Sequence, residues 1–134
     1  MGSLIGSNDD YQKAVNCLEE IADLGWDTYV TYNNMGVLYE RMGSYTKANK
    51  VYIEMLSKYG EDYRTYKRLA FLEVNIQATK ANSERDYEQF VIYYDKAKEL
   101  FEASKAKADS DLEMQLLANA YQQLIDGNWI EAEE

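Results

Sequence analysis

Apolar residues recur every three or four positions along most of the chain, and this spacing is typical of amphipathic helices. Between residues 29 and 43, for example, Tyr32, Met35 and Tyr39 fall on one face of a helix. Polar stretches and glycines separate the periodic segments, and the chain contains no proline. The pattern therefore predicts an all-α fold in which several helices are joined by turns.

The helical pattern itself repeats with a period of 34 residues. Aromatic or apolar residues coincide when the chain is shifted by this length: Tyr11 with Tyr45, Ala14 with Ala48, Tyr29 with Tyr63, Tyr32 with Tyr66 and Leu38 with Leu72. A fixed period of this size indicates stacked helical units, each of which packs against its neighbours.

The period and the residues that follow it resemble the tetratricopeptide repeat, a helix-turn-helix unit of the same length. The residues of segment 29–62 that match this family are Tyr32, Met35, Gly36, Tyr39, Gly43, Tyr45, Ala48 and Tyr52. The segment departs from the family at Gly60, where the repeat usually has proline. The resemblance implies antiparallel helical hairpins stacked as a short α-solenoid. We call the two helices of each unit the first-type and the second-type helix.

Glycine is unexpected inside the first-type helix, where Gly36 lies beside Met35 and Tyr39. It costs a helix about 1 kcal/mol relative to alanine, so we expect the missing side chain to allow the next helix a close approach. Gly43 is predicted to end this helix, and the hydroxyl of Ser44 is predicted to cap the following one.

By length the 134 residues form a single domain, which the repeat divides into four parts. These parts are a partial repeat with only a second-type helix, ended by Gly25 (residues 1–28), a complete repeat (29–62), a repeat with a 15-residue insertion (63–109), and a terminal helix with the start of a further helix (110–134).

The insertion lengthens the second hairpin, because 27 positions separate Ala70 from Ala97 whereas 12 separate Gly36 from Ala48. It includes the polar stretch QATKANSERD, residues 77–86, which is predicted to be a loop joining two lengthened helices.

The last segment begins with SDLE, where Ser110 has the spacing of a capping box ahead of an apolar helix. Gly127, Trp129 and Ala132 then match Gly43, Tyr45 and Ala48 at a spacing of 84 residues. The sequence leaves open whether Trp129 begins another repeat or covers the last helix.

The chain is acidic, with a formal net charge of -10. This charge argues against a nucleic-acid partner, because binding to phosphates requires clustered Lys and Arg. No apolar run is long enough to cross a membrane. The single cysteine, Cys17, and the lack of a recognisable signal peptide favour a cytoplasmic protein. Because Cys17 lies near the apolar positions Ala14, Leu18 and Ile21 of its helix, we expect a buried, unreactive thiol.

The residue types give little support to an enzyme. The chain has no histidine, the commonest general base and metal ligand, and no metal-ligand spacing is recognised. The acidic pairs are typical of solvated helix surfaces. We therefore expect no catalytic residue, no metal and no cofactor.

Binding is the better prediction, because first-type helices line the concave groove of such stacks and hold an extended peptide or a partner helix. The candidate groove residues are Asn33, Asn34, Val37, Arg41, Arg64, Lys67, Arg68, Phe71 and Asn75. Arg64, Lys67 and Arg68 share one helix face and form a basic island in an acidic protein.

The repeat family also suggests a ligand for this groove. Chaperone-binding members hold the terminal carboxylate of a peptide, and Asn34, Arg64 and Arg68 match positions of that clamp. The resemblance thus implies a protein or peptide with an acidic segment or a terminal carboxylate. The alternative is that the basic residues pair with nearby acids such as Glu61, Asp62 and Glu73.

The run from TYNNMGVLYERMG through EDYRTYKRLAFLEV to LIDGNW also resembles, more loosely, the C-terminal repeat region of some bacterial serine/threonine protein kinases. No kinase motif is present in the chain, so the resemblance implies a regulatory or docking appendage. The sequence thus predicts a non-catalytic protein-interaction module. The alternative is a structural segment that stacks end to end in a longer solenoid or a homo-oligomer.

Overall fold

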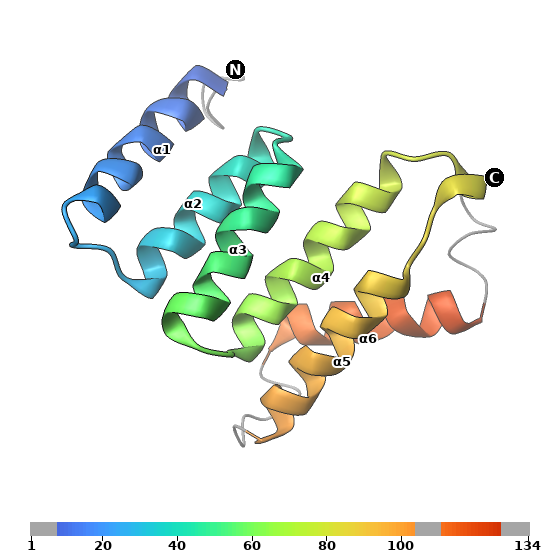
Figure 1. Ribbon diagram of the computed structural model, residues 1–134. Coiled ribbons are helices and arrows are strands. Elements are labelled where there is room, and N and C mark those ends of the chain that lie inside the picture. The colour runs from blue at the N-terminus through green and yellow to red at the C-terminus, as the bar shows by residue number, and fades with distance from the viewer. Residues whose placement is uncertain (1–7, 104–110, 127–134) are drawn as a thin grey trace. The chain divides into compact units, whose positions relative to one another are not determined.

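The computed structural model describes residues 8–103 and 111–126 of the chain, and these residues form helices joined by turns, without any strand. The helices, shown in Figure 1, are α1 (Asn8–Asp23), α2 (Tyr29–Arg41), α3 (Tyr45–Tyr59), α4 (Tyr63–Ala78), the short 3-10 helix η2 (Asn82–Glu84), α5 (Glu88–Ala103) and α6 (Leu112–Ile125). The predicted all-α class is confirmed.

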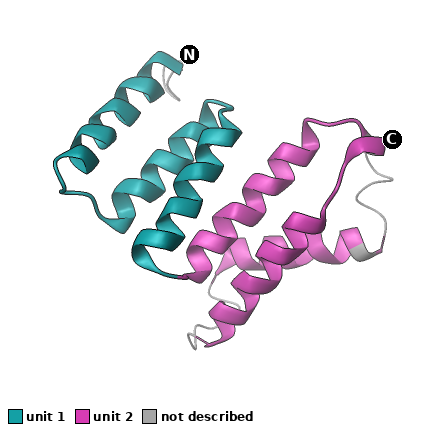
Figure 2. Cartoon of the chain, in the orientation of Figure 1, with its two compact units in different colours: residues 1–60 teal, residues 61–134 magenta. Residues whose placement is uncertain are grey.

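The chain divides into two compact units, residues 1–60 and 61–134, as Figure 2 shows. The boundary falls between α3 and α4. Each unit is defined by itself, so the single domain expected from the length stays a prediction.

Unit 1 contains α1, α2 and α3, and α2 packs against both of the others. A methyl group placed on Gly36 would lie 2.3 Å from a ring carbon of Tyr52, which is fully buried on α3. The predicted close approach at Gly36 is therefore confirmed. The hydroxyl of Tyr52 donates a hydrogen bond back to Glu40 of α2, which fixes the ring against the glycine.

Unit 2 contains α4 and α5, which form a hairpin, and α6, which packs against both. Its core consists of Ala70, Tyr87, Phe90, Tyr94, Ala97, Phe101, Met114 and Leu117. The ring of Tyr94 on α5 stacks on Tyr121 of α6 with centroids 4.7 Å apart. Aromatic stacking and apolar burial thus hold α6 on the hairpin.

The helix ends follow the glycines. Gly43 and Gly60 have φ angles of 76° and 83°, in the left-handed region where only glycine is unstrained. Both follow a helix, as does Gly25, so the helix ends predicted at Gly25 and Gly43 are confirmed.

The predicted cap at Ser44 is wrong. Ser44 precedes α3, but its side chain makes no capping hydrogen bond. Its ψ angle is 65°, whereas Asp62, whose carboxylate does cap α4, is extended with a ψ of 134°. An extended cap residue directs its side chain at the free N–H groups of the first turn, and Ser44 lacks that conformation.

The insertion is distributed over both helices of the second hairpin and their connection. Residues 79–87 join α4 to α5, whereas residues 42–44 join α2 to α3. The helix α5 begins nine residues before Ala97, while α3 begins three residues before Ala48. The predicted lengthening is confirmed, although the first residues of the predicted loop, Gln77 and Ala78, belong to α4.

Buried Gln77 explains how this longer connection is ordered. Its side-chain oxygen accepts a hydrogen bond from the backbone N–H of Asp86 at 2.8 Å, and its side-chain nitrogen donates to Glu73 at 3.0 Å. The guanidinium of Arg85 donates to the backbone oxygen of Lys80 at 3.0 Å. Polar groups at the end of α4 are thus used to hold the connection.

The terminal helix α6 shows the first-type pattern in a register that the sequence reasoning missed. Met114 and Leu117 are buried and Tyr121 is partly buried, which is the spacing of Tyr32, Met35 and Tyr39 on α2. The side chain that caps α6 is Asp111, which accepts from the N–H of Met114 at 3.1 Å. The predicted cap Ser110 lies outside the described residues, as do Gly127, Trp129 and Ala132.

Candidate functional site

Three of the predicted groove residues line one groove of unit 1. Asn34 and Arg41 are exposed on α2, and Val37 between them is partly buried. The groove lies between α1 and α2, has a volume of about 480 Å³, and is lined by Ala14, Cys17, Leu18, Asn34, Val37, Leu38 and Arg41. The fourth prediction for this unit, Asn33, is partly buried and does not line it.

The groove combines an apolar surface with a few polar groups. Ala14 and Leu18 of α1 face Val37 and Leu38 of α2 across it. Polar groups come from the amide of Asn34, the thiol of Cys17 and the guanidinium of Arg41. Such a surface offers burial for apolar side chains and a positive charge for a carboxylate.

Arg41 is free to bind an external anion. It stands in the last turn of α2, and within the part of the chain that the structure describes it makes no ion pair. A cation at this end of a helix also favours the helix dipole, which explains its place without an acidic partner.

The expectation of a buried thiol is wrong, because Cys17 is exposed. The only buried residue of α1 is Val15, which lies on another side of the helix. Among the described helices α1 packs closely only against α2, so the face that carries Cys17 stays open toward the groove.

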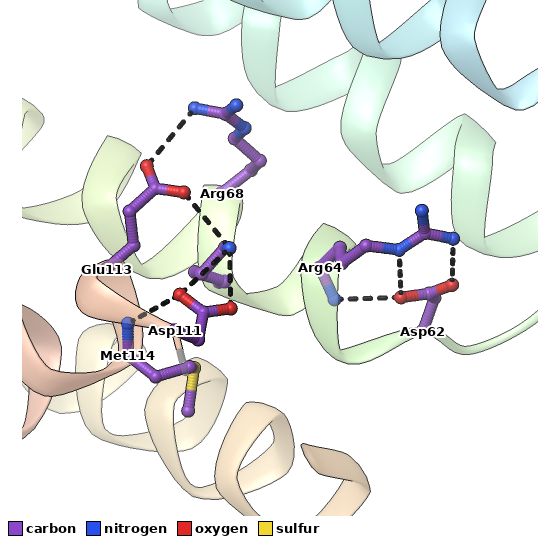
Figure 3. Close-up of polar contacts among 7 residues, drawn as sticks. Asp62, Arg64, Arg68, Asp111, Glu113 and Met114 are labelled. Carbon is purple, nitrogen blue, oxygen red and sulfur yellow. Dashed lines mark hydrogen bonds and ion pairs between the residues drawn. The ribbon is translucent and has the colours of Figure 1, made fainter. Parts of the chain in front are cut away.

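The basic island of unit 2 is occupied by acids of the same unit, as Figure 3 shows. Arg64 donates to both carboxylate oxygens of Asp62, at 3.0 and 2.7 Å, and its backbone N–H donates to the same group at 2.8 Å. The hydrogen bonds from Arg64 hold the pKa of Asp62 below its usual value. The alternative of pairing with nearby acids is confirmed for these two residues.

Lys67 is buried, with 7% of its surface exposed. Its ammonium lies 3.1 Å from a carboxylate oxygen of Asp111 and 3.0 Å from one of Glu113, and 5.6 Å from the centre of the Tyr63 ring. An external carboxylate would have to displace one of these two acids to reach it.

The pKa values around Lys67 follow from this arrangement. Burial alone would lower the pKa of Lys67, but the hydrogen bonds to Glu113 and Asp111 outweigh it and raise that pKa. Burial would likewise raise the pKa of Asp111, and the N–H of Met114 together with Lys67 lowers it instead. Both groups are therefore held in their charged forms.

Of the other predicted residues of unit 2, only Arg68 lies near the acids that bind Lys67. Arg68 is partly buried, with a guanidinium nitrogen 3.8 Å from Glu113. Phe71 packs against the unit 2 core, whereas Asn75 is exposed. Because each unit is defined by itself, a groove built from residues of both units stays a prediction.

Sequence reasoning missed Asp111 and Glu113 as the partners of the basic island. Asp111 is 44 residues away from Lys67 along the chain, and only the packing of α6 on α4 brings the two together. A usable signal was the pattern of Met114, Leu117 and Tyr121, which makes α6 a first-type helix that packs beside α4.

A second polar cluster in unit 1 also escaped the sequence reasoning. Asp27, in the turn before α2, accepts from the hydroxyl of Tyr59 at 2.6 Å and lies 3.3 Å from the ammonium of Lys58. The rings of Tyr29 and Tyr32 pack edge-on to Tyr59. The hydrogen bond from Tyr59 lowers the pKa of Asp27, and the cluster ties the α1–α2 turn to the end of α3.

Within residues 8–103 and 111–126, no group of three or more His, Cys, Asp and Glu side chains is arranged to hold a metal ion. No helix among these residues is both long and apolar enough to span a membrane. Comparison of the chain with protein-family models, with curated proteins and with solved structures gives no match. The candidate site therefore rests on its own geometry.

Proposed function

We propose that the chain is a non-catalytic protein-interaction module of tetratricopeptide type, and that the α1–α2 groove of unit 1 is its binding surface. The observation that carries this proposal is the joint position of Asn34, Val37 and Arg41 in one groove. These residues were selected from the sequence by their positions in the repeat. The stacking of the hairpins as an α-solenoid is part of the proposal.

The occupant that fits this groove is an amphipathic peptide with one carboxylate. Its apolar side chains would cover Leu18, Val37 and Leu38, and each buried CH₂ contributes about 0.8 kcal/mol. Its carboxylate would pair with Arg41, whose planar guanidinium binds two oxygens at once. An exposed ion pair contributes about 0.2–1 kcal/mol, so apolar contact supplies most of the affinity and Arg41 mainly sets the direction of the peptide.

Unit 2 supports this role less well. Lys67 is buried with two acids, and Arg64 binds Asp62 through both carboxylate oxygens. Displacing Asp62 or Asp111 would also remove the cap of α4 or α6. A ligand of Arg64 or Lys67 therefore has to displace an acid that also caps a helix.

The test is to select binders from a displayed library of peptides about 16 residues long, close to the length of one of these helices. Selected peptides should combine apolar residues at helical spacing with an acidic residue. Arg41→Glu should weaken their binding about tenfold or more. Lys50→Glu, the same charge change at an exposed site on α3, should leave it unchanged. A library that yields no binder, or binders indifferent to both Arg41→Glu and Val37→Asp, would contradict the proposal.

The kinase-associated role is a separate proposal that rests on the sequence resemblance alone. The reading frame on either side of the chain tests it. An adjoining kinase domain would support a regulatory or docking appendage, whereas its absence would remove that role without affecting the groove.

A further inference from the structure

The groove of unit 1 has the features of a site that one further helix could occupy. On α3, the second-type helix of a complete hairpin, Ala48, Tyr52 and Met55 are fully buried. The equivalent residues of α1, which are Ala14, Leu18 and Ile21, are only partly buried. The difference arises because α2 covers this face of α3, whereas no described helix of unit 1 covers it on α1.

The helix that would complete this arrangement is a first-type helix. In unit 1 a first-type helix, α2, packs against a second-type helix, α3, and in unit 2 two first-type helices, α4 and α6, pack against each other. A helix in the groove would lie against both α1, a second-type helix, and α2, a first-type helix, because residues of both line it.

The chain carries a helix with a suitable exposed apolar face, namely α6. The residues of α6 that correspond to the basic island of α4 are Leu112, Gln115 and Leu116. Leu112 is 68% exposed and Leu116 is 50% exposed. Asn119 and Gln123 continue the same exposed side. These side chains are uncharged, so they can be buried without the cost of desolvating an ion.

We propose that the groove between α1 and α2 receives α6 from a second copy of the chain. This inference rests on the proposed function and names the partner of the same groove. The two surfaces are different, so the association is head-to-tail and leaves one groove and one α6 free at the ends of each assembly.

The charges of the two surfaces agree with this pairing. Tyr66 of α4 and Met114 of α6 occupy the same repeat position, so Lys67 is equivalent to Gln115. Lys67 nevertheless contacts Asp111 and Glu113, which lie four and two residues before Gln115. A residue on one first-type helix thus contacts residues of the following first-type helix that lie two to four repeat positions before its own equivalent. Asp126 is exposed at the end of α6 and is equivalent to Ser44 in the repeat. The same offset would therefore place Asp126 of an incoming α6 beside Glu40, Arg41 and Met42 of α2. Arg41, which makes no ion pair among residues 8–103 and 111–126, would then pair with an acid.

Sedimentation equilibrium of the full chain, from about 10 µM to about 1 mM, measures this association. The average mass should rise with concentration. Leu116→Asp should abolish the rise, because it would place a charge in the apolar groove. Ile92→Asp is the matched control, since Ile92 on α5 is also 50% exposed and should associate as the unchanged chain does.

The charge pair gives a second, independent test. Arg41→Glu and Asp126→Arg should each weaken self-association about tenfold, and the double variant should recover most of the loss. A mixture of Leu116→Asp chains with Val37→Asp chains should form only one-to-one dimers, because each variant has a charge in one surface and keeps the other intact. Dimers formed by either variant alone would contradict a head-to-tail interface.

The outcomes also separate this inference from the proposed function. A chain that stays monomeric to about 1 mM overturns the second-copy partner. If that monomer still binds library-selected peptides in an Arg41-dependent manner, the groove remains the binding surface for another protein. If it binds neither its own copies nor peptides, both proposals are overturned.

Discussion

The α2–α3 hairpin of unit 1 and the α4–α5 hairpin of unit 2 each carry a predicted groove cation on their first helix, but the surroundings of the two cations differ. Arg41 lines an open groove and makes no ion pair within the described part of the chain, whereas Lys67 is buried against Asp111 and Glu113. The difference comes from α6, which brings two carboxylates to α4. A position in the repeat therefore marks a face of a helix, and the neighbouring helix decides whether that face is available to a partner.

The two hairpins also solve the same packing problem with different residues. Gly36 of α2 accommodates the Tyr52 ring, whose hydroxyl bonds to Glu40. In unit 2 the equivalent position is Ala70, and the residue equivalent to Tyr52 is Phe101, which packs edge-on to Tyr63. Between the two hairpins, the smaller residue, glycine, is thus paired with the larger ring, tyrosine, and alanine is paired with phenylalanine. This indicates that the two side-chain volumes are matched where the helices cross.

The largest expected effect is on the Gly36 contact. Gly36→Leu would place a side chain where a methyl group already lies 2.3 Å from Tyr52, and should destabilise unit 1 by about 3 kcal/mol. This loss exceeds the gain of about 1 kcal/mol in helix propensity. Urea unfolding followed by circular dichroism measures it. Asn34→Leu, on the exposed side of the same helix, is the control and should cost less than about 0.5 kcal/mol.

The second prediction separates the two cations directly. Lys67→Met should destabilise unit 2 by about 2 kcal/mol, because Asp111 and Glu113 would lose their buried partner. Arg41→Met should change the unfolding free energy by less than about 0.5 kcal/mol. Thermal or urea unfolding of both variants tests the difference. Equal losses would mean that Arg41 is as engaged as Lys67, contrary to the comparison.

The third prediction concerns the residues that precede α3 and α4 and could cap these helices. Asp62→Ala removes the carboxylate that caps α4 and should cost about 1 kcal/mol. Ser44→Ala should cost almost nothing, because the Ser44 side chain makes no capping hydrogen bond. Unfolding free energies of the two variants decide the matter, and a comparable loss at Ser44 would show that its hydroxyl caps α3 in solution.

The smallest expected effect is a dependence on pH. The lowered pKa of Asp111 means that its contribution is complete above the unfolded value, about 4, and is lost as the pH falls through the lower folded value. The raised pKa of Lys67 means that its contribution is lost only as the pH rises through a folded value above 10.5. Stability should therefore fall below about pH 4, and the fall should be smaller in Lys67→Met. An equal fall in both proteins would contradict the ion pair.

Local features of the fold were predictable from the sequence because they depend on nearby residues. The period of Tyr32, Met35 and Tyr39 predicted a helix face, and Gly43 predicted its end, since both follow from local geometry. Ser44 was predicted less well, because side-chain capping also requires an extended backbone that the sequence does not specify.

The candidate site was predictable only in part. The repeat positions located Asn34, Val37 and Arg41 on a common groove. The repeat positions did not predict that Lys67 is buried, because its partner Asp111, at the start of α6, comes near only through the packing of the helices. Cys17 was misplaced for the same reason, since its exposure depends on which helix covers α1.

The central claim is that partners bind at the α1–α2 groove and not at the basic island of unit 2. The most direct measurement is a nuclear magnetic resonance titration of the isotope-labelled chain with a library-selected peptide. The account predicts that the signals of Asn34, Val37 and Arg41 shift in proportion to peptide bound, while those of Arg64 and Arg68 stay in place. Shifts concentrated at Arg64 and Arg68, with the groove signals unmoved, would contradict it.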